Sequence, residues 1–157
     1  MQNRMKTHPL KDEEIKELLL KVQTGSIATL NENNIPYVLA VHFVYMDNKI
    51  YIHGLPKGEK IDNIKRNSKV GFTAYEVQGF LLDKDEKPCD TNTEYKSVVL
   101  NGDAKIIENL ELKKSVLKKI VEKYTPHLAD KEIPENMIKG TGVIEIEIDE
   151  ITGKYYN

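Results

Sequence analysis

The sequence contains one cysteine, no tryptophan and almost no net charge. The lone Cys89 excludes an internal disulfide. A formal net charge of −2 over 157 residues does not favour a nucleic acid or an anionic membrane as a partner. No apolar run approaches the roughly 20 residues of a membrane span, and the first residues lack the apolar segment of a secretion signal. These absences favour a cytoplasmic protein.

The sequence also offers little for metal binding or nucleophilic catalysis. Its four histidines lack the close spacing of zinc ligands, so we expect no metal site. Cys89 lies in a polar segment beside Lys87 and Asp90, and no base is placed to activate its thiol. Glu145 and Glu147 lie two residues apart, and a solvated strand face accounts for them better than a general acid and base do.

What the sequence does contain is the balance of a globular domain. Hydrophobic residues make up 39% and charged residues 31%, and 157 residues suffice for one domain with a core. We therefore expect residues 1–157 to form a single domain. Within it, the polar stretch 1–11 is predicted to be an extended arm, and residues 149–157 a polar C-terminal tail.

Hydrophobic periodicity predicts helices and six strands. Apolar residues recur every three or four positions in the predicted helices, 12–23, 59–67, 109–125 and 134–139. Alternating or continuous apolar runs mark the predicted strands, 25–30, 37–46, 49–53, 70–77, 95–107 and 142–148. In the last strand we expect the apolar side chains to face inward and the glutamates outward. The segment 79–93 is predicted to be irregular.

Turn signals indicate how these strands connect. The pairs at 33–34 and 47–48 consist of Asn and Asp residues that suit tight hairpins, so the first three strands form an antiparallel meander. Asn101 and Gly102 interrupt the long fifth strand and indicate a bulge or bend. Six apolar antiparallel strands favour a small barrel, which has no sheet edges. The alternative is an open α+β sheet covered on one face.

One stretch, 49–72, has the order strand, Gly- and Lys-rich turn, short helix, strand. Lys57, Gly58 and Lys60 lie where the helix begins. A helix N-terminus presents unpaired N–H groups, glycine permits close approach, and lysine adds charge, so a phosphate could bind there. The alternative is a solvated basic turn.

Five segments together resemble the flavin-binding split-barrel superfamily, the pyridoxamine 5′-phosphate oxidase-like proteins, and within it the 5-nitroimidazole-resistance branch. They are GSIATL at 25–30, PYVLAV at 36–41, IYIHG at 50–54, KGEKIDNIKRN at 57–67 and EYKSVVLNGDAK at 94–105. No single segment is specific, but their order and spacing across 26–148 are.

The resemblance implies a mainly β protein, a six-stranded Greek-key split barrel with flanking helices. It implies a homodimer with flavin mononucleotide (FMN) at the subunit interface, held mostly by one subunit. Carried over position by position, the residues that contact the cofactor are Leu39, Ala40, Val41, His53, Gly54, Lys57, Lys60, Tyr95, Lys96, Ser97 and Val98. Lys60, with Lys57, would meet the phosphate. Lys96 stands where the family often has arginine, so a bidentate phosphate contact is not expected there.

The function implied is an FMN-dependent oxidoreductase that reduces a small organic acceptor, such as a nitroaromatic compound. His53 would lie on the substrate side as a proton donor, although a histidine that only bonds a loop is an equal reading. His42 is better read as a structural or interface histidine. The absence of a GxGxxG segment indicates that an electron donor visits the flavin transiently. The alternative is a non-catalytic flavin- or haem-binding module, and a weaker one is an oligonucleotide-binding barrel.

Overall fold

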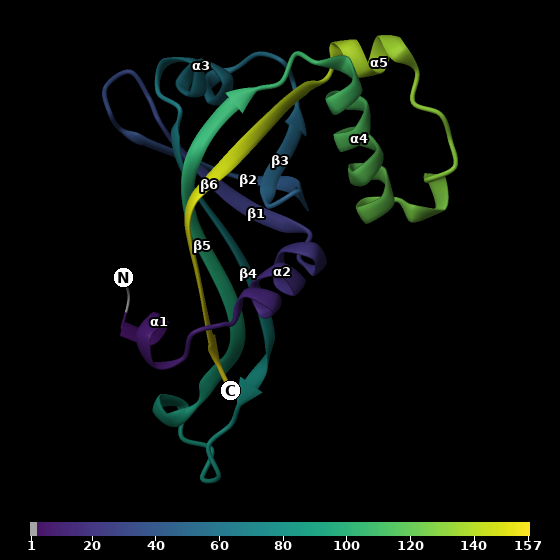
Figure 1. Cartoon of the computed structure of the whole chain (residues 1–157). Coiled ribbons are helices and arrows are strands. Elements are labelled where there is room, and N and C mark those ends of the chain that lie inside the picture. The colour runs from purple at the N-terminus through teal and green to yellow at the C-terminus, as the bar shows by residue number, and fades with distance from the viewer. Residues whose placement is uncertain (1–2) are drawn as a thin grey trace.

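A computed structural model describes residues 3–157 as one closed barrel with helices around it (Figure 1). Neighbouring strands are antiparallel and follow the order β1-β2-β3-β6-β5-β4. The strands are β1 (Thr24–Leu30), β2 (Pro36–Met46), β3 (Lys49–Gly54), β4 (Lys69–Leu81), β5 (Asn92–Ile106) and β6 (Gly142–Tyr156). Because β4 closes onto β1 and β6 inserts between β3 and β5, the topology is a Greek key. The predicted barrel is confirmed, and the open sheet is wrong.

The helices lie at the ends and on one side of the barrel. They are α1 (Asn3–Thr7), α2 (Asp12–Lys21), α3 (Glu59–Arg66), α4 (Leu110–Tyr124) and α5 (Glu135–Gly140), with short 3-10 turns at Pro88–Asp90 and Pro126–Leu128. Asn109 caps α4, as its side chain accepts a hydrogen bond from the Leu112 N–H at 2.9 Å. No helix among residues 3–157 is long and apolar enough to cross a membrane.

The tight hairpin predicted at Asp47 and Asn48 is confirmed, whereas the 33–34 pair lies in a longer loop, 31–35, in which only Asn34 is left-handed. Asn34 has φ 59°, and Asp47 and Asn48 have φ 52° and 59°. Two successive left-handed residues match the twist of a two-residue hairpin. The loop 31–35 and this hairpin connect β1, β2 and β3 as the predicted meander.

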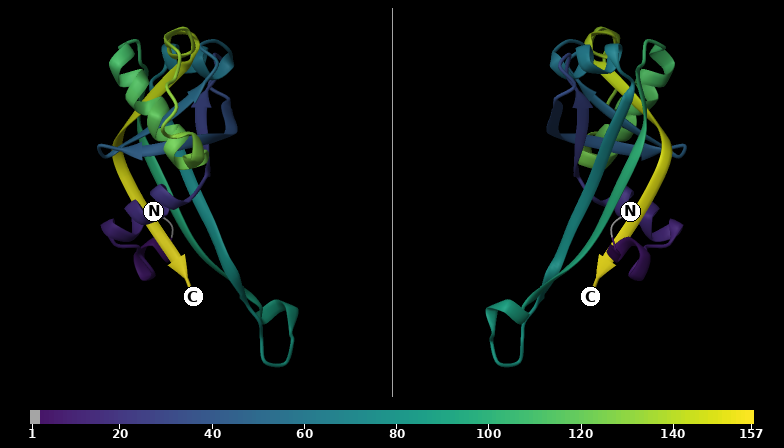
Figure 2. Two further views of the ribbon diagram at one scale, coloured as in Figure 1. Left: turned by 90° about the vertical axis from the view of Figure 1, so that its right-hand side faces the viewer. Right: turned by 90° about the vertical axis from the view of Figure 1, so that its left-hand side faces the viewer.

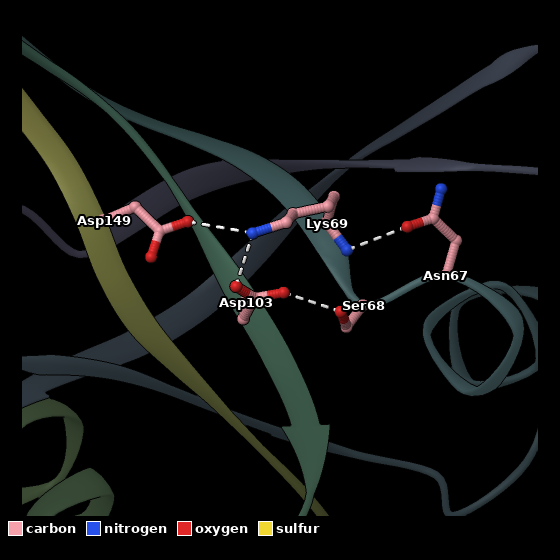
Figure 3. Close-up of polar contacts among 5 residues, drawn as sticks. All are labelled: Asn67, Ser68, Lys69, Asp103 and Asp149. Carbon is pink, nitrogen blue, oxygen red and sulfur yellow. Dashed lines mark hydrogen bonds and ion pairs between the residues drawn. The ribbon is translucent and has the colours of Figure 1, made fainter.

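A bulge lies where the sequence predicted one. The β5–β6 register shifts between Asn101 and Gly102, and Asp149 on β6 is the extra residue. A Cβ on Gly102 would lie 2.1 Å from the Glu147 carbonyl oxygen, so only glycine permits this approach. The side chain of Asp149 meets Lys69 at 3.2 Å, and Lys69 also pairs with Asp103 at 2.6 Å (Figure 3). These exposed ion pairs tie β4, β5 and β6 together at the bend but add little stability.

The main core fills the barrel interior. Phe43 of β2 and Phe72 of β4 meet edge to face with ring centroids 4.9 Å apart. Leu18 and Leu19 of α2 close one end of the barrel onto this core. Other buried members are Ile27, Ile50, Ile52, Val98, Leu100, Ile144 and Ile146.

A second core lies outside the barrel wall, where α4 covers β2, β3 and β6. Val44, Tyr51 and Val143 point outward and pack under Val116 and Ile120. The outer face of β6 is therefore shielded from water over its first residues. The sequence pattern could not reveal this, because alternation shows two faces but not what covers the second.

The expectation that the glutamates of β6 face water is therefore wrong for Glu145, which is only 3% exposed. Burial by itself disfavours its charge, but hydrogen bonds from Lys105, Lys49 and Tyr51 hold the pKa of Glu145 at about 2. The Tyr51 hydroxyl donates at 2.8 Å and the Lys49 ammonium at 2.9 Å. Glu147 is exposed, as predicted.

The predictions for the two ends of the chain, an extended arm and a polar tail, are wrong. Residues 149–157 are not a tail, because β6 continues to Tyr156 and pairs with β5 as far as Tyr95. Without this pairing half of β5 would present an open edge. Asn3–Thr7 is a short helix rather than an extended arm, and Pro9 bridges to Lys154. Residues 1 and 2 lie outside the described residues.

The segment 79–93 is only partly irregular. β4 runs on to Leu81 and β5 begins at Asn92, so the two strands form a ladder that projects beyond the barrel (Figure 2). We call residues 79–93 the hairpin arm. It lies at the opposite end of the molecule from α3 (Figures 1 and 2).

Candidate functional site

The predicted phosphate turn connects the end of β3 to the start of α3. Gly58 lies just before the helix with φ 119°, a conformation that favours glycine. Its carbonyl accepts hydrogen bonds from the N–H groups of Ile61 and Asp62. Ile61 and Ile64 are buried and anchor the helix to the barrel. The turn is therefore held rigidly beside Gly54.

Lys60 is the residue of this turn that faces the end of β3. Its ammonium nitrogen lies 3.8 Å from the point where a Cβ on Gly54 would stand. The side chain is half-buried, and burial lowers the pKa of Lys60. No carboxylate among residues 3–157 forms an ion pair with it. A partly desolvated ammonium without a counter-charge is suited to bind an anion. Lys57 is exposed.

His53 lies next to this ammonium and has an unused ring nitrogen. Its Nδ1 is buried and has no hydrogen-bond partner among the described residues. Burial lowers the pKa of His53, and the nearby charges of His42 and Lys60 lower it further. The imidazole is therefore neutral at pH 7. A buried polar atom without a partner in the chain is a candidate contact for a ligand.

His42 belongs to the same group. Phe43 pairs with Ile52, so His42 and His53 follow as the next residues of β2 and β3. The His42 ring stacks on Tyr124 with centroids 4.5 Å apart and planes at 25°. This stack agrees with the prediction that His42 is a structural histidine. The strand register places His42 beside His53.

The last turn of α4 holds this part of β2 in place. The Tyr124 hydroxyl accepts from the Phe43 N–H at 2.8 Å and lies 2.6 Å from the Gln23 carbonyl, to which it donates. The Lys123 ammonium donates to the Leu19 and Phe43 carbonyls at 3.1 Å each, and burial lowers its pKa to about 8. The sequence pattern placed Tyr124 on the apolar face of the helix but did not reveal its hydrogen bonds. The Lys-rich face 113–123 was predicted to be solvated, which is wrong for Lys123. The available signal was spacing, since Lys123 lies three residues after the buried Ile120.

The predicted β2 segment presents an unpaired edge next to these side chains. Leu39 and Val41 point into the barrel and Ala40 points outward. On one side this segment pairs with β1, but pairing with β3 begins only at Phe43. Main-chain N–H and C=O groups before Phe43 on that side have no strand partner. They are available to hydrogen-bond the edge of a planar ligand.

The remaining predicted residues lie elsewhere, in the middle of β5. Ser97 and Val98 are buried, Lys96 forms a 3.4 Å ion pair with Glu14, and the Tyr95 ring lies 5.5 Å from that of Tyr75. β5 comes level with the end of β3 only near Ile106, which shares Ile144 of β6 as a pairing partner with Ile52.

The structure therefore brings together one part of the predicted site and leaves the other apart. Val98 is eight residues from Ile106, a distance of about 26 Å at about 3.3 Å per residue. His53, Gly54 and Lys60 form one group, and residues 95–98 form another. The β2 segment is in register with the second group as well, since Val41 pairs with Gly25, Gly25 with Ala74 and Ala74 with Val98.

Other surface features do not compete with this site. A hollow of about 360 Å³ lies beside α4, lined by residues such as Lys118, Val121 and Ile133. It contains none of the predicted residues. Residues 3–157 contain no cluster of three or more His, Cys, Asp or Glu side chains that could hold a metal. Cys89 is exposed on the hairpin arm.

Comparisons with known proteins agree with the fold. The sequence model of a family described as pyridoxamine 5′-phosphate oxidase matches residues 11–155. A candidate 5-nitroimidazole antibiotic resistance protein from Bacteroides thetaiotaomicron is similar in structure, with TM-score 0.77 and 24% identity over 94% of this chain and 86% of that one. A search of curated proteins found no match.

Two further solved structures are similar in fold. The flavocytochrome Anf3 from Azotobacter vinelandii has TM-score 0.79 and 19% identity over 94% of this chain and 68% of that one. A FAD and heme binding protein from Mycobacterium smegmatis has TM-score 0.82 and 14% identity over 94% of this chain and 72% of that one. At these identities the likeness concerns the fold.

Proposed function

Because the chain belongs to the pyridoxamine 5′-phosphate oxidase family, we propose that it is an FMN-dependent oxidoreductase that reduces a small organic acceptor such as a nitroaromatic compound. The observation that carries this proposal is the group at the end of β3. There a half-buried Lys60 without a counter-charge adjoins Gly54 and the unpartnered Nδ1 of His53. The cytoplasm is the proposed location.

The residues at this site fit FMN. The phosphate would bind at Lys60, with Lys57 at the outer edge, because an anion compensates a partly buried ammonium. The polar edge of the ring system would meet the unpaired main-chain edge around Ala40, next to His42, because alternation points the main-chain groups of Leu39 and Val41 toward β1. Gly54 leaves room for close approach to the Lys60 ammonium.

When bound, FMN would supply the electron transfer, and the chain would supply binding, orientation and protons. His53 would lie toward the acceptor, where its neutral ring donates one N–H. Its pKa is lowered mainly by burial, so an added anion nearby would raise it and favour proton uptake. The same ring could then deliver a proton to a reduced acceptor.

The proposal includes a homodimer with FMN at the interface, supported by an uncharged outer face on β1, β2, β4 and β5. Although 31% of the sequence is charged, the outward positions in the middle of these strands carry no charge. They are Ser26, Ala28, Val38, Ala40, Thr73, Tyr75, Val77 and Val99. Pairing this face with a second copy would bury it and could bring Tyr95–Val98 of one subunit to the Lys60 group of the other.

The test is a titration of the purified protein with FMN, followed by absorbance and flavin fluorescence, with riboflavin as the control. We expect FMN to bind more tightly than riboflavin, because only FMN has a phosphate. The loaded protein should then reduce a nitroaromatic compound when a nicotinamide donor is added. Failure of both flavins to bind would overturn the proposal. Binding without turnover of any acceptor would leave only a flavin carrier.

A second candidate function is a non-catalytic haem- or flavin-binding module. The specific observation in its favour is the adjacent pair of imidazoles, exposed His42 and half-buried His53, at an unpaired strand edge. Imidazole nitrogen is a common axial ligand of haem iron. Titration with hemin should give a sharp Soret band that His53→Ala or His42→Ala removes if this candidate is correct. An unspecific broad band in both variants and in the wild type would exclude it.

A further inference from the structure

The hairpin arm is not part of the closed barrel. Beyond the irregularity between Val77 and Gly79, β4 and β5 pair only with each other, through Phe80 with Thr93 and Leu81 with Asn92. No helix or strand among residues 3–157 covers this end, and the arm projects freely from the barrel (Figure 2).

The base of the arm is apolar and exposed. Phe80 is 69% exposed and Leu82 is 75% exposed, with Leu81 between them at 37%. Three consecutive large apolar residues on a free hairpin are unusual on a monomer surface and indicate a binding surface. The arm also continues the uncharged outer face, since Tyr75 and Val77 precede it on β4.

The tip beyond these residues has a defined shape. The Asp83 carboxylate accepts hydrogen bonds from the Asp85 and Lys87 N–H groups at 2.9 and 3.3 Å. Glu86 takes a left-handed conformation with φ 58°, and the turn closes through Pro88–Asp90. The polar tip is therefore an ordered turn closed by its own hydrogen bonds.

Strand geometry decides what the arm can reach. From Thr93, at the base of the arm, to Ile106, level with the end of β3, is 13 residues, or about 43 Å at about 3.3 Å per residue. The arm of a chain therefore cannot touch its own Lys60. Tyr95, however, lies only two residues from Thr93. If Tyr95–Val98 of one subunit complete the site of the other, the arm must continue over that other subunit.

We propose that the arm of each subunit lies across the flavin site of the other subunit, where Phe80 and Leu82 cover the acceptor side. This proposal rests on the proposed function, and its occupant is a second copy of this chain. The receiving surface carries Leu55, which is 74% exposed and follows His53 and Gly54 directly. Apolar contact between Phe80, Leu82 and this leucine excludes water from the imidazole. The arm then determines which acceptors enter.

The first experiment is chemical cross-linking between subunits. Leu82→Cys is made in a Cys89→Ser background, and isotopically labelled and unlabelled chains are mixed. A short reagent joins the introduced thiol to nearby lysines. We expect peptides that link position 82 of one isotope to Lys57 of the other. Ser115→Cys, on the exposed face of α4, is the control and should give no link to Lys57.

The second experiment measures acceptor access. Phe80→Ser/Leu82→Ser should leave FMN affinity unchanged, speed quenching of the bound flavin by iodide, and raise KM for the acceptor on the order of tenfold. Lys84→Ser, on the polar tip, is the matched control and should change none of these. Since all three side chains are exposed, unchanged thermal unfolding is expected for both variants.

The outcomes separate this inference from the proposed function. If wild-type protein does not bind FMN, the proposed function fails. If it binds FMN as a dimer, but position 82 gives no intersubunit link to Lys57 and the arm variant quenches like wild type, the arm proposal alone is wrong.

Discussion

Two half-buried groups at the end of β3, the Lys60 ammonium and the Nδ1 of His53, have no partner among residues 3–157. Both have lowered pKa values because burial penalises their charged forms. Burying such groups without a partner destabilises the free protein. An anion that binds beside them offsets this destabilisation. At the proposed flavin site, ligand binding would thus offset a cost that the free protein carries.

Replacing Lys60 with alanine should weaken FMN binding and leave riboflavin binding unchanged. Loss of one charge-assisted contact costs about 1.5–3 kcal/mol, which is roughly 10- to 150-fold in Kd. Fluorescence titration measures both ligands. Lys65→Ala, exposed on the same helix, is the control. Equal FMN affinity in wild type and Lys60→Ala would show that the phosphate binds elsewhere.

The pKa of His53 should lie below the ordinary value of about 6.5 in the free protein and rise on addition of FMN. Because the folded pKa is the lower one, the unfolded chain binds more protons below about pH 6.5, and stability falls as the pH falls from there toward the folded pKa. NMR titration of the imidazole gives the pKa directly. His53→Gln should reduce the acid loss of stability seen in urea melts. A pKa of His53 that FMN does not shift would contradict this placement.

At the scale of elements, α4 does more than cover the barrel. Its last turn fixes the point where β2 leaves β3, through Lys123 and Tyr124. The unpaired edge of β2 therefore begins at a defined residue. The helix also shields the outer face of β6 from water, so Glu145 is buried. Its carboxylate is compensated there by a hydrogen bond from Tyr51 and by ion pairs with two lysines.

Tyr124→Phe should destabilise the fold by about 1–3 kcal/mol, because the Phe43 N–H loses its partner where it is partly buried. The stack on His42 needs only the ring and should persist. Urea unfolding measures the difference. Tyr45→Phe removes an exposed hydroxyl contact to Asn48 and serves as the control, with a smaller effect. Equal losses in the two variants would show that Tyr124 does not hold β2.

At the scale of the whole molecule, the two groups of predicted residues lie at different levels of one barrel. The separation is a consequence of the long β4 and β5 strands, which carry Tyr95–Val98 away from Lys60. In the proposed homodimer, a second copy bound at the uncharged outer face would reconcile the two groups.

Val38→Lys should shift the protein from dimer to monomer and weaken FMN binding together. Val38 is 61% exposed on β2, so the chain itself should still fold, but a lysine inside an interface would lose its hydration. Light scattering gives the molar mass, to be compared with 18.0 kDa for one chain. Leu20→Lys, at 58% exposure on α2, is the matched control. Dimers that persist in Val38→Lys would place the interface on another face.

Predictions from the sequence succeeded where the responsible residues are neighbours along the chain. Local periodicity located the central strands and the helices, Asp47 and Asn48 identified a hairpin, and Gly102 marked the bulge. The turn that presents Lys60 was predictable for the same reason. The strand beyond residue 149 was missed, because Asp149 is a bulge residue that breaks the alternation on which the prediction relied.

The sequence by itself determined the elements, the barrel class and the family resemblance, since these depend on period, turn chemistry and ordered motifs. Only the tertiary structure decided that Glu145 is buried, that Lys123 holds a strand, and that β2 has an unpaired edge. It also decided that Tyr95–Val98 lie far from Lys60. Each of these depends on which distant segment packs against a residue, and pairing partners and covering helices are set by the closure of the barrel, not by local pattern.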